Sequence, residues 1–258
     1  MNIQNLFDEL AALEQVEAIA LGGSRATGKN DESSDYDIYL YITDKIPDKT
    51  RREVLSNYCN VMEIGNHYWE YEDNCTLKNG VDIDILYRSL NDFAAGIKSV
   101  VDEGNASNGY TTCMWHNLLT CKIIADKSGN LTKLKQSYTR PYPDKLRENI
   151  ITKNRKLLGG VLPSYNHQIK KAESRGDLVS VNHRTTEFLA SYFDIIFALN
   201  RLTHPGEKRL ASLCKQNCKI LPNKFEENLS ALFFNMFSGN ISPIIEDIIS
   251  CLDEVTRY

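Results

Sequence analysis

Two short motifs near the start of the chain carry groups suited to phosphate chemistry. Gly22, Gly23 and Ser24 form a run of small residues, and Asp35 and Asp37 follow after a spacer of ten residues. Glycine adopts backbone angles closed to other residues, so the amides and the hydroxyl of such a turn can approach a phosphate closely. Adjacent carboxylates repel one another unless a cation lies between them, and hard oxygen ligands suit Mg²⁺. Together the motifs predict a site for a metal–nucleotide complex.

Two strands are expected to position these groups. The apolar run at residues 16–21 predicts a strand that ends at the glycine turn, and residues 38–41 predict a second strand that continues from the acids. Residues i and i+2 of a strand share a face. Asp35 and Asp37 are therefore expected to point the same way, as two ligands of one ion must.

The two motifs resemble a known signature. Gly23-Ser24 followed by Asp35-x-Asp37 with apolar flanks is similar to the signature of the nucleotidyltransferase superfamily related to DNA polymerase beta. The resemblance implies Mg²⁺ as cofactor and ATP, or another nucleoside triphosphate, as co-substrate. It also implies that the two aspartates bind the metal and that Gly23, Ser24 and Arg25 cradle the phosphates. A loop with solvated surface acids is the alternative interpretation.

Members of this superfamily usually supply a third carboxylate from a later strand. Residues 81–87 are the downstream segment that alternates acidic and apolar residues, and they offer Asp82 and Asp84 on one strand face. We favour Asp84 because residues 85–87 and Ile83 give it the better apolar flanks, and we keep Asp82 as the alternative. This acid would complete the metal site or accept the proton of the attacking hydroxyl.

Composition and charge limit the classes of partner. The 258 residues are 42% hydrophobic and 25% charged, which suits one large or two modest globular domains. The formal net charge of −4 argues against broad binding of nucleic acid. No apolar run approaches the roughly 20 residues that a membrane span requires. We therefore expect neither a membrane nor nucleic acid as a partner.

Cysteine usage and the N-terminal pattern predict the compartment. The seven cysteines are odd in number and show no paired framework, which fits reduced thiols. Residues 1–10 form an acidic amphipathic pattern that lacks the basic start and apolar centre of a signal peptide. A cytoplasmic protein is expected.

The chain changes character near Pro141 and Pro143, which disfavour helix locally. Short β-like runs alternate with helical segments before this point, and helical patterns dominate after it. We predict an α+β protein with a catalytic nucleotidyltransferase domain over residues 1–140, built on a mixed sheet with flanking helices, and a C-terminal helical bundle over residues 141–258. The helices expected in the bundle cover about 145–160, 163–176, 177–201, 206–219 and 225–257.

The longest of these helices, residues 177–201, has an amphipathic pattern with Asp177 as the expected N-cap. Its polar stripe includes His183, Glu187 and Asp194. The opposite stripe is apolar and is expected to face the core: Val181, Phe188, Tyr192, Ile195, Ile196 and Leu199. The polar stripe either faces solvent or lines a cleft, and the small alanines beside it favour the cleft. In that case Glu187 is an alternative general base.

Three further segments carry a second resemblance, at residues 109–116, 177–184 and 198–209. They are similar to a bacterial group of nucleotidyltransferases known mostly as an uncharacterised conserved domain and related to aminoglycoside and lincosamide nucleotidyltransferases. The resemblance implies a helical second domain and a basic residue that reaches the triphosphate. Lys208 is the favoured candidate for this role, because it follows a Pro-Gly turn at the expected start of a helix. A solvated helix lysine is the alternative.

The function expected from these motifs is Mg²⁺-dependent transfer of a nucleoside monophosphate, AMP from ATP, to a hydroxyl of a small-molecule acceptor. An antibiotic is one candidate acceptor. One alternative is an antitoxin-like enzyme that adenylylates a protein or tRNA, although such enzymes are normally much smaller chains paired with a separate helical partner. Another is a non-catalytic protein that binds a nucleotide or a partner, although that alternative predicts missing metal acids.

Overall fold

The computed structural model describes residues 2–28, 31 and 34–256, which form two compact units. One unit contains Met1–Ile97 and Asn117–Arg140, and the other contains Lys98–His116 and Pro141–Tyr258. Residues 98–116, which we expected in the first domain, therefore belong to the second unit. The functional domains expected over residues 1–140 and 141–258 stay predictions.

Residues 98–116 join the second unit through polar bonds to its long helices. The backbone N–H of Gly109 donates to Asn154 Oδ1 at 3.0 Å. The backbone N–H and the hydroxyl of Thr111 donate to the two carboxylate oxygens of Asp194, at 3.1 and 2.6 Å. These partners are more than forty positions away in sequence, so local patterns could not reveal them.

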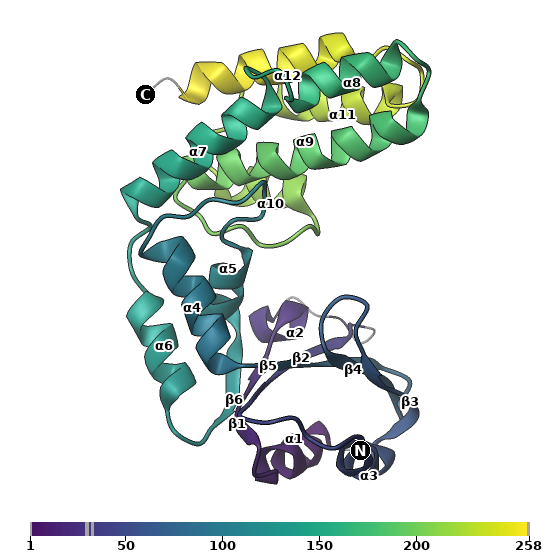
Figure 1. Cartoon of the computed structure of the whole chain (residues 1–258), viewed down its shortest axis with the longest axis vertical. Helices are drawn as coiled ribbons and strands as arrows, with labels where there is room; N and C mark the ends of the chain where they lie inside the picture. The colour runs from purple at the N-terminus through teal and green to yellow at the C-terminus, as the bar shows by residue number, and fades with distance from the viewer. Residues whose placement is uncertain (1, 29–30, 32–33, 257–258) are drawn as a thin grey trace. The chain divides into compact units, whose positions relative to one another are not determined.

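In the first unit, the described residues form a six-stranded mixed sheet (Figure 1). The strands are β1 (Val16–Leu21), β2 (Tyr36–Ile42), β3 (Cys59–Asn66), β4 (Glu72–Leu77), β5 (Asp82–Arg88) and β6 (Lys122–Asp126). Their order is β3-β4-β5-β2-β1-β6, and β2 runs parallel to β5 while the other neighbours are antiparallel. The predicted α+β class is confirmed.

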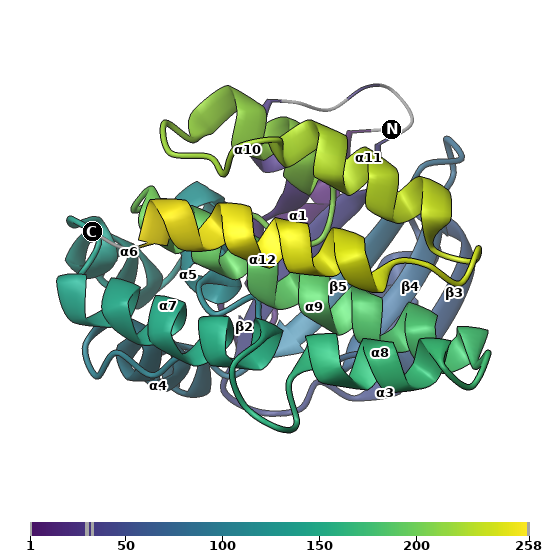
Figure 2. The same cartoon turned by 90° about the horizontal axis from the view of Figure 1, so that it is seen from above.

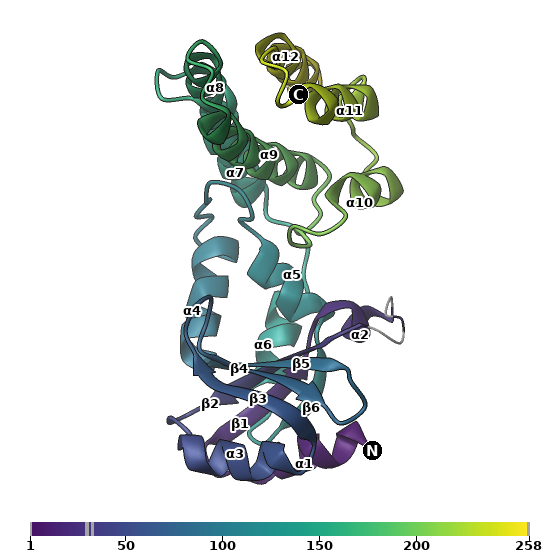
Figure 3. The ribbon, with the colours of Figure 1, turned by 90° about the vertical axis from the view of Figure 1, so that its right-hand side faces the viewer.

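Helices cover the sheet of the first unit. They are α1 (Ile3–Ala12), α2 (Gly23–Thr27), α3 (Asp48–Ser56) and α6 (Asn130–Tyr138), and α4 (Leu90–Val101) and α5 (Cys113–Thr120) continue into the second unit. Helices α1 and α3 lie together on one face of the sheet (Figure 3). Leu6, Leu10 and Leu55 of these helices are fully buried against strand residues such as Ile38 and Ile85. Because side chains alternate along a strand, Asp37 and Asp84 point to the opposite face.

The second unit is helical (Figure 2). Its further helices are α7 (Asp144–Leu158), α8 (Tyr165–Glu173), α9 (Leu178–Leu199), α10 (Leu210–Asn217), α11 (Phe225–Asn235) and α12 (Ser242–Thr256). Every member of the apolar stripe predicted on α9 is buried in the core of this unit. The Asp177 side chain accepts from Ser180 N at 3.0 Å, so the predicted N-cap is confirmed.

The helix expected over residues 225–257 was wrong as a single element. It is divided into α11 and α12, and Gly239 lies between them with φ +80°. Glycine tolerates this left-handed backbone in the connection because it has no Cβ. Pro243 then occupies the first turn of α12, where its missing N–H leaves no intrahelical bond unmade.

No disulfide joins any of the seven cysteines, all of which lie among the described residues. Within the part of the chain that the structure describes, no helix combines the length and the apolar character needed to cross a bilayer.

Candidate active site

The glycine turn lies where β1 passes the neighbouring strand β2. The backbone N–H of Gly22 donates to the carbonyl of Asp37 at 2.8 Å. Gly23 has φ +59°, and a Cβ at this position would overlap Asp37 Oδ2. A Cβ on Gly22 would likewise overlap the ring of Tyr39. Both glycines leave room for the close approach of β2 side chains, and Gly23 lies directly against the Asp37 carboxylate.

The three predicted acids converge on one point. Asp35, Asp37 and Asp84 each present one oxygen, and these oxygens all lie within 4.8 Å of one another at half-buried positions. The cause is the parallel pairing of β2 with β5, which places Asp37 opposite Asp84. Asp82 is instead exposed and accepts from Thr76 Oγ1 at 2.8 Å.

Arg25 of α2 ties the turn to the segment that leads into β2. Its Nε lies 2.8 Å from Ser34 O and 3.0 Å from Asp35 O. Its guanidinium carbon lies 3.9 Å from the centre of the Tyr36 ring. Arg25 therefore holds the backbone of Asp35 in place. The contact with phosphate expected for Arg25 stays a prediction, as does that of the half-buried Ser24.

This site matches a known family. Residues 2–98 match the model described as Polymerase beta, Nucleotidyltransferase. Residues 2–98 therefore carry a nucleotidyltransferase domain of the polymerase beta superfamily. Residues 110–210 match a second model, described as a domain of unknown function, DUF4037. This range includes nearly all of the three segments that carry the second resemblance.

Two solved structures are similar to the chain at 11% identity each. The match to a nucleotidyltransferase-like protein from Exiguobacterium sibiricum 255-15 spans 98% of this chain and 74% of that protein, with a TM-score of 0.44. The match to an aminoglycoside 6-adenyltransferase from Bacillus subtilis spans 100% of this chain and 92% of that protein, with a TM-score of 0.30. Both superpose too loosely to bear on function. No protein of curated function matches the chain significantly.

The donor set of the nucleotidyltransferase domain fits a divalent cation. Three carboxylates that converge within 4.8 Å repel one another in the absence of positive charge. Their ligand atoms are hard oxygens, which suit Mg²⁺ or Mn²⁺ better than the softer metals that prefer thiolates. Asp35, Asp37 and Asp84 would hold such an ion.

Strand β4 adds two polar residues that the sequence patterns did not single out. Asn74 lies opposite Asp84 and donates Nδ2–H to Asp84 Oδ1 at 2.8 Å. Glu72 shares that sheet face and is only 7% exposed. Burial raises the pKa of Glu72, a hydrogen bond with Asn74 opposes this, and the charges of Asp84 and Glu70 raise it further. The sequence signal that could have identified these residues is the polar side chain at every second position of β4: Glu72, Asn74 and Thr76.

A buried ionic network fixes β4 against the rest of the domain. Arg51 and Asp73 have fully buried side chains and form an ion pair. Asp73 also accepts from Tyr87 Oη at 2.7 Å and from the backbone N–H of Gly65 at 2.8 Å. Removing one partner of such a network leaves an uncompensated buried charge, so it holds strands β3, β4 and β5 in one register.

The remaining predicted residues lie in the second compact unit, and their roles stay predictions. Glu187 on α9 is half-buried and accepts from Tyr165 Oη at 3.4 Å. Lys208 is exposed in the turn before α10.

The polar stripe of α9 does not behave as one surface. Glu187 is half-buried and His183 is exposed, but Asp194 is only 1% exposed. Burial raises the pKa of Asp194 to about 6, against the opposing effect of its bonds from Thr111. The interpretation of Asp194 as part of a cleft wall or solvent face was therefore wrong, because residues 98–116 cover it.

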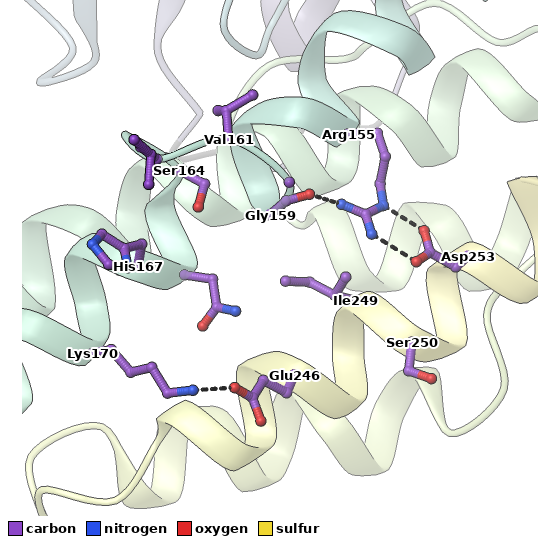
Figure 4. A pocket seen from close by; sticks show the side chains of 13 residues that line it. Arg155, Gly159, Val161, Ser164, His167, Lys170, Glu246, Ile249, Ser250 and Asp253 are labelled. Carbon is purple, nitrogen blue, oxygen red and sulfur yellow. Dashed lines mark hydrogen bonds and ion pairs between the residues drawn. The ribbon is translucent and has the colours of Figure 1, made fainter.

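The second unit has a surface hollow of about 710 Å³ beside α12 (Figure 4). Ion pairs from α12 bound it on two sides: Asp253 with Arg155, and Glu246 with Lys170 at 2.5 Å. None of the site residues predicted from the sequence lines it.

Proposed function

We propose that this chain transfers AMP from ATP, with Mg²⁺, to a hydroxyl group of a small molecule. The observation that supports this most directly is the contact between Gly23 and the Asp37 carboxylate, because it joins the turn proposed to bind phosphate to the acids proposed to bind the metal. Nucleotidyl transfer needs both features at one place, since the metal and the turn act on the same triphosphate.

The chain's own groups suit the steps of this reaction. Asp35, Asp37 and Asp84 would bind the divalent ion, which when bound supplies positive charge to the triphosphate. The amides of the glycine turn and the Ser24 hydroxyl would bind the β- and γ-phosphates and orient them. Lys208 is proposed to neutralise charge on the departing pyrophosphate.

In this reaction the acceptor oxygen attacks the α-phosphorus, the bond from that phosphorus to the pyrophosphate oxygen breaks, and pyrophosphate leaves. The proton of the acceptor hydroxyl passes to a carboxylate, for which Asp84 and Glu187 are the two candidates. The helical unit fused in the same chain supports a small-molecule acceptor, and an antibiotic is one candidate. A non-catalytic role is less favoured, because all three acids are present and convergent.

The test is incubation of the purified chain with each labelled nucleoside triphosphate, Mg²⁺ and a library of hydroxylated metabolites and antibiotics. We expect a nucleotidylated small molecule with the wild type and with Asp82→Asn, and none with Asp37→Asn. A label on a protein or tRNA would favour the antitoxin-like alternative. Failure of the wild type to bind any triphosphate in the presence of Mg²⁺ would refute the proposal.

A further inference from the structure

The carboxylate of Asp84 is held from the side of β4. Asn74 Nδ2 donates to Asp84 Oδ1 at 2.8 Å, and the two residues are direct partners in the β4–β5 register. One oxygen of Asp84 is thus bound by a neutral donor on the neighbouring strand. The orientation of this carboxylate toward Asp35 and Asp37 is set by a residue outside the acid cluster.

A second amide determines which way Asn74 faces. Asn66 Nδ2 donates to Asn74 Oδ1 at 2.7 Å and to Glu63 Oε2 at 3.2 Å. Carboxylates only accept hydrogen bonds, so Glu63 and Asp84 at the two ends require both amides to present their NH₂ groups in this one arrangement. A flipped Asn74 would place its oxygen against Asp84. The two carboxylates therefore determine the direction of the hydrogen bonds that run from Asn66 to Asn74 and from Asn74 to Asp84.

A β-bulge brings Asn66 onto this face. The β3–β4 register shifts between Ile64 and Asn66, where Gly65 has φ +80°. Residues three apart on a regular strand point to opposite faces, yet Asn66 bonds to Glu63 because the extra residue of the bulge re-aims its side chain. The backbone N–H of Gly65 is bound by the buried Asp73, which anchors the bulge.

We infer that Asn74 is a positioning residue which, aimed by Asn66, holds Asp84 in the geometry that binds the divalent metal. This inference rests on the proposed nucleotidyl transfer at the same site. Hydrogen-bond partners of metal ligands orient those ligands, and their loss typically costs about 10- to 100-fold in metal affinity or activity.

The same strand pair provides a matched control. Thr76 lies opposite Asp82 and donates its hydroxyl at 2.8 Å, two residues along β4 from Asn74. This pair has the same cross-strand relation as Asn74 and Asp84, but Asp82 is exposed and lies outside the acid cluster. It also shows that a threonine in this register can donate to the opposite aspartate.

The experiment measures Mn²⁺ binding to the full chain by electron paramagnetic resonance, with thermal unfolding measured in parallel. Asn74→Ala is expected to weaken Mn²⁺ binding roughly 10- to 100-fold, and Asn66→Ala to weaken it less. Thr76→Ala should bind Mn²⁺ as the wild type does. Asn74→Thr should restore most of the affinity, because its hydroxyl can donate to Asp84. In an Asp84→Asn background, Asn74→Ala should cause no further loss.

Three results would overturn the inference, and they are distinguishable. Wild-type Mn²⁺ affinity in Asn74→Ala would overturn the positioning role and leave the proposed function standing. Absence of Mn²⁺ binding by the wild type would overturn the metal site itself, and with it both proposals. Should Asn74→Ala lower the melting temperature while Asn74→Thr keeps that of the wild type, the Mn²⁺ affinity of Asn74→Thr is compared with that of the wild type. If Asn74→Thr then lost as much Mn²⁺ affinity as Asn74→Ala, the positioning role would also be refuted.

Discussion

The contact of Gly23 with Asp37 predicts that an alanine at Gly23 lowers activity far more than an alanine at Gly28, although the two lower stability by similar amounts. Gly23 and Gly28 both have left-handed backbones, with φ +59° and +69°. An alanine in this conformation costs about 1–2 kcal/mol at either position. A Cβ on Gly28 would meet nothing within 4 Å, whereas one on Gly23 would overlap Asp37 Oδ2 and lie 3.0 Å from Asp37 Cγ.

The two substitutions should therefore destabilise the chain about equally and differ in activity. The overlap at Gly23 is with the end of a side chain, so rotation of Asp37 relieves it at little cost to folding. That rotation moves a proposed metal ligand by more than about 1 Å, and a displacement of this size can cost about 100-fold in rate. We expect Gly23→Ala to lose at least this factor in kcat/KM, and Gly28→Ala to stay within about three-fold of the wild type.

The assay is pyrophosphate release with the acceptor identified in the screen, together with Mn²⁺ binding, which needs no acceptor. Melting temperatures of both variants show whether the backbone cost is shared. If Gly23→Ala and Gly28→Ala retained the same activity and the same Mn²⁺ affinity, the position of the Asp37 carboxylate would not matter and the reasoning would be refuted.

Three other predictions follow from the placement of single residues. Asp84→Asn should abolish transfer and Asp82→Asn should leave it nearly unchanged in the same pyrophosphate assay, and equal losses would remove the distinction drawn from the register. Lys208→Ala should raise the KM for ATP and lower kcat/KM roughly ten- to a hundred-fold without changing the melting temperature, whereas unchanged kinetics would mark Lys208 as a solvated lysine. Burial raises the pKa of Asp194 from 3.8 to about 6, so the folded state binds its proton more tightly than the unfolded state. The free energy of unfolding should thus fall by roughly 3 kcal/mol as pH rises from below 3.8 to above 6. Denaturant titrations at pH 4 and pH 7 measure this fall, and Asp194→Asn should remove it. An identical fall in the variant would contradict its assignment to Asp194.

Local patterns in the sequence were sufficient for the fold class and for most of the helices and strands. Alternation of apolar and acidic residues is a property of a strand alone, so the strands that carry Asp37 and Asp84 were predictable with their polar faces. The glycine turn follows β1 and the acid pair leads into β2, the next strand in the sequence, which is why the two motifs could be singled out together. The N-cap of α9 at Asp177 was predictable for the same reason, since its partner Ser180 lies three residues away.

The register between distant segments could be decided only by the tertiary structure. Asp82 and Asp84 share a strand face, and their apolar flanks favoured Asp84 without excluding Asp82. Only the pairing of β5 with β2 places Asp84 opposite Asp37. Asn74 enters the site because β4 pairs with β5, and its orientation depends on a bulge held by a buried aspartate. The burial of Asp194 likewise depends on a segment more than eighty positions away. Periodicity specifies which face of an element a side chain occupies, whereas the neighbour across that face is set by long-range packing that no local window contains.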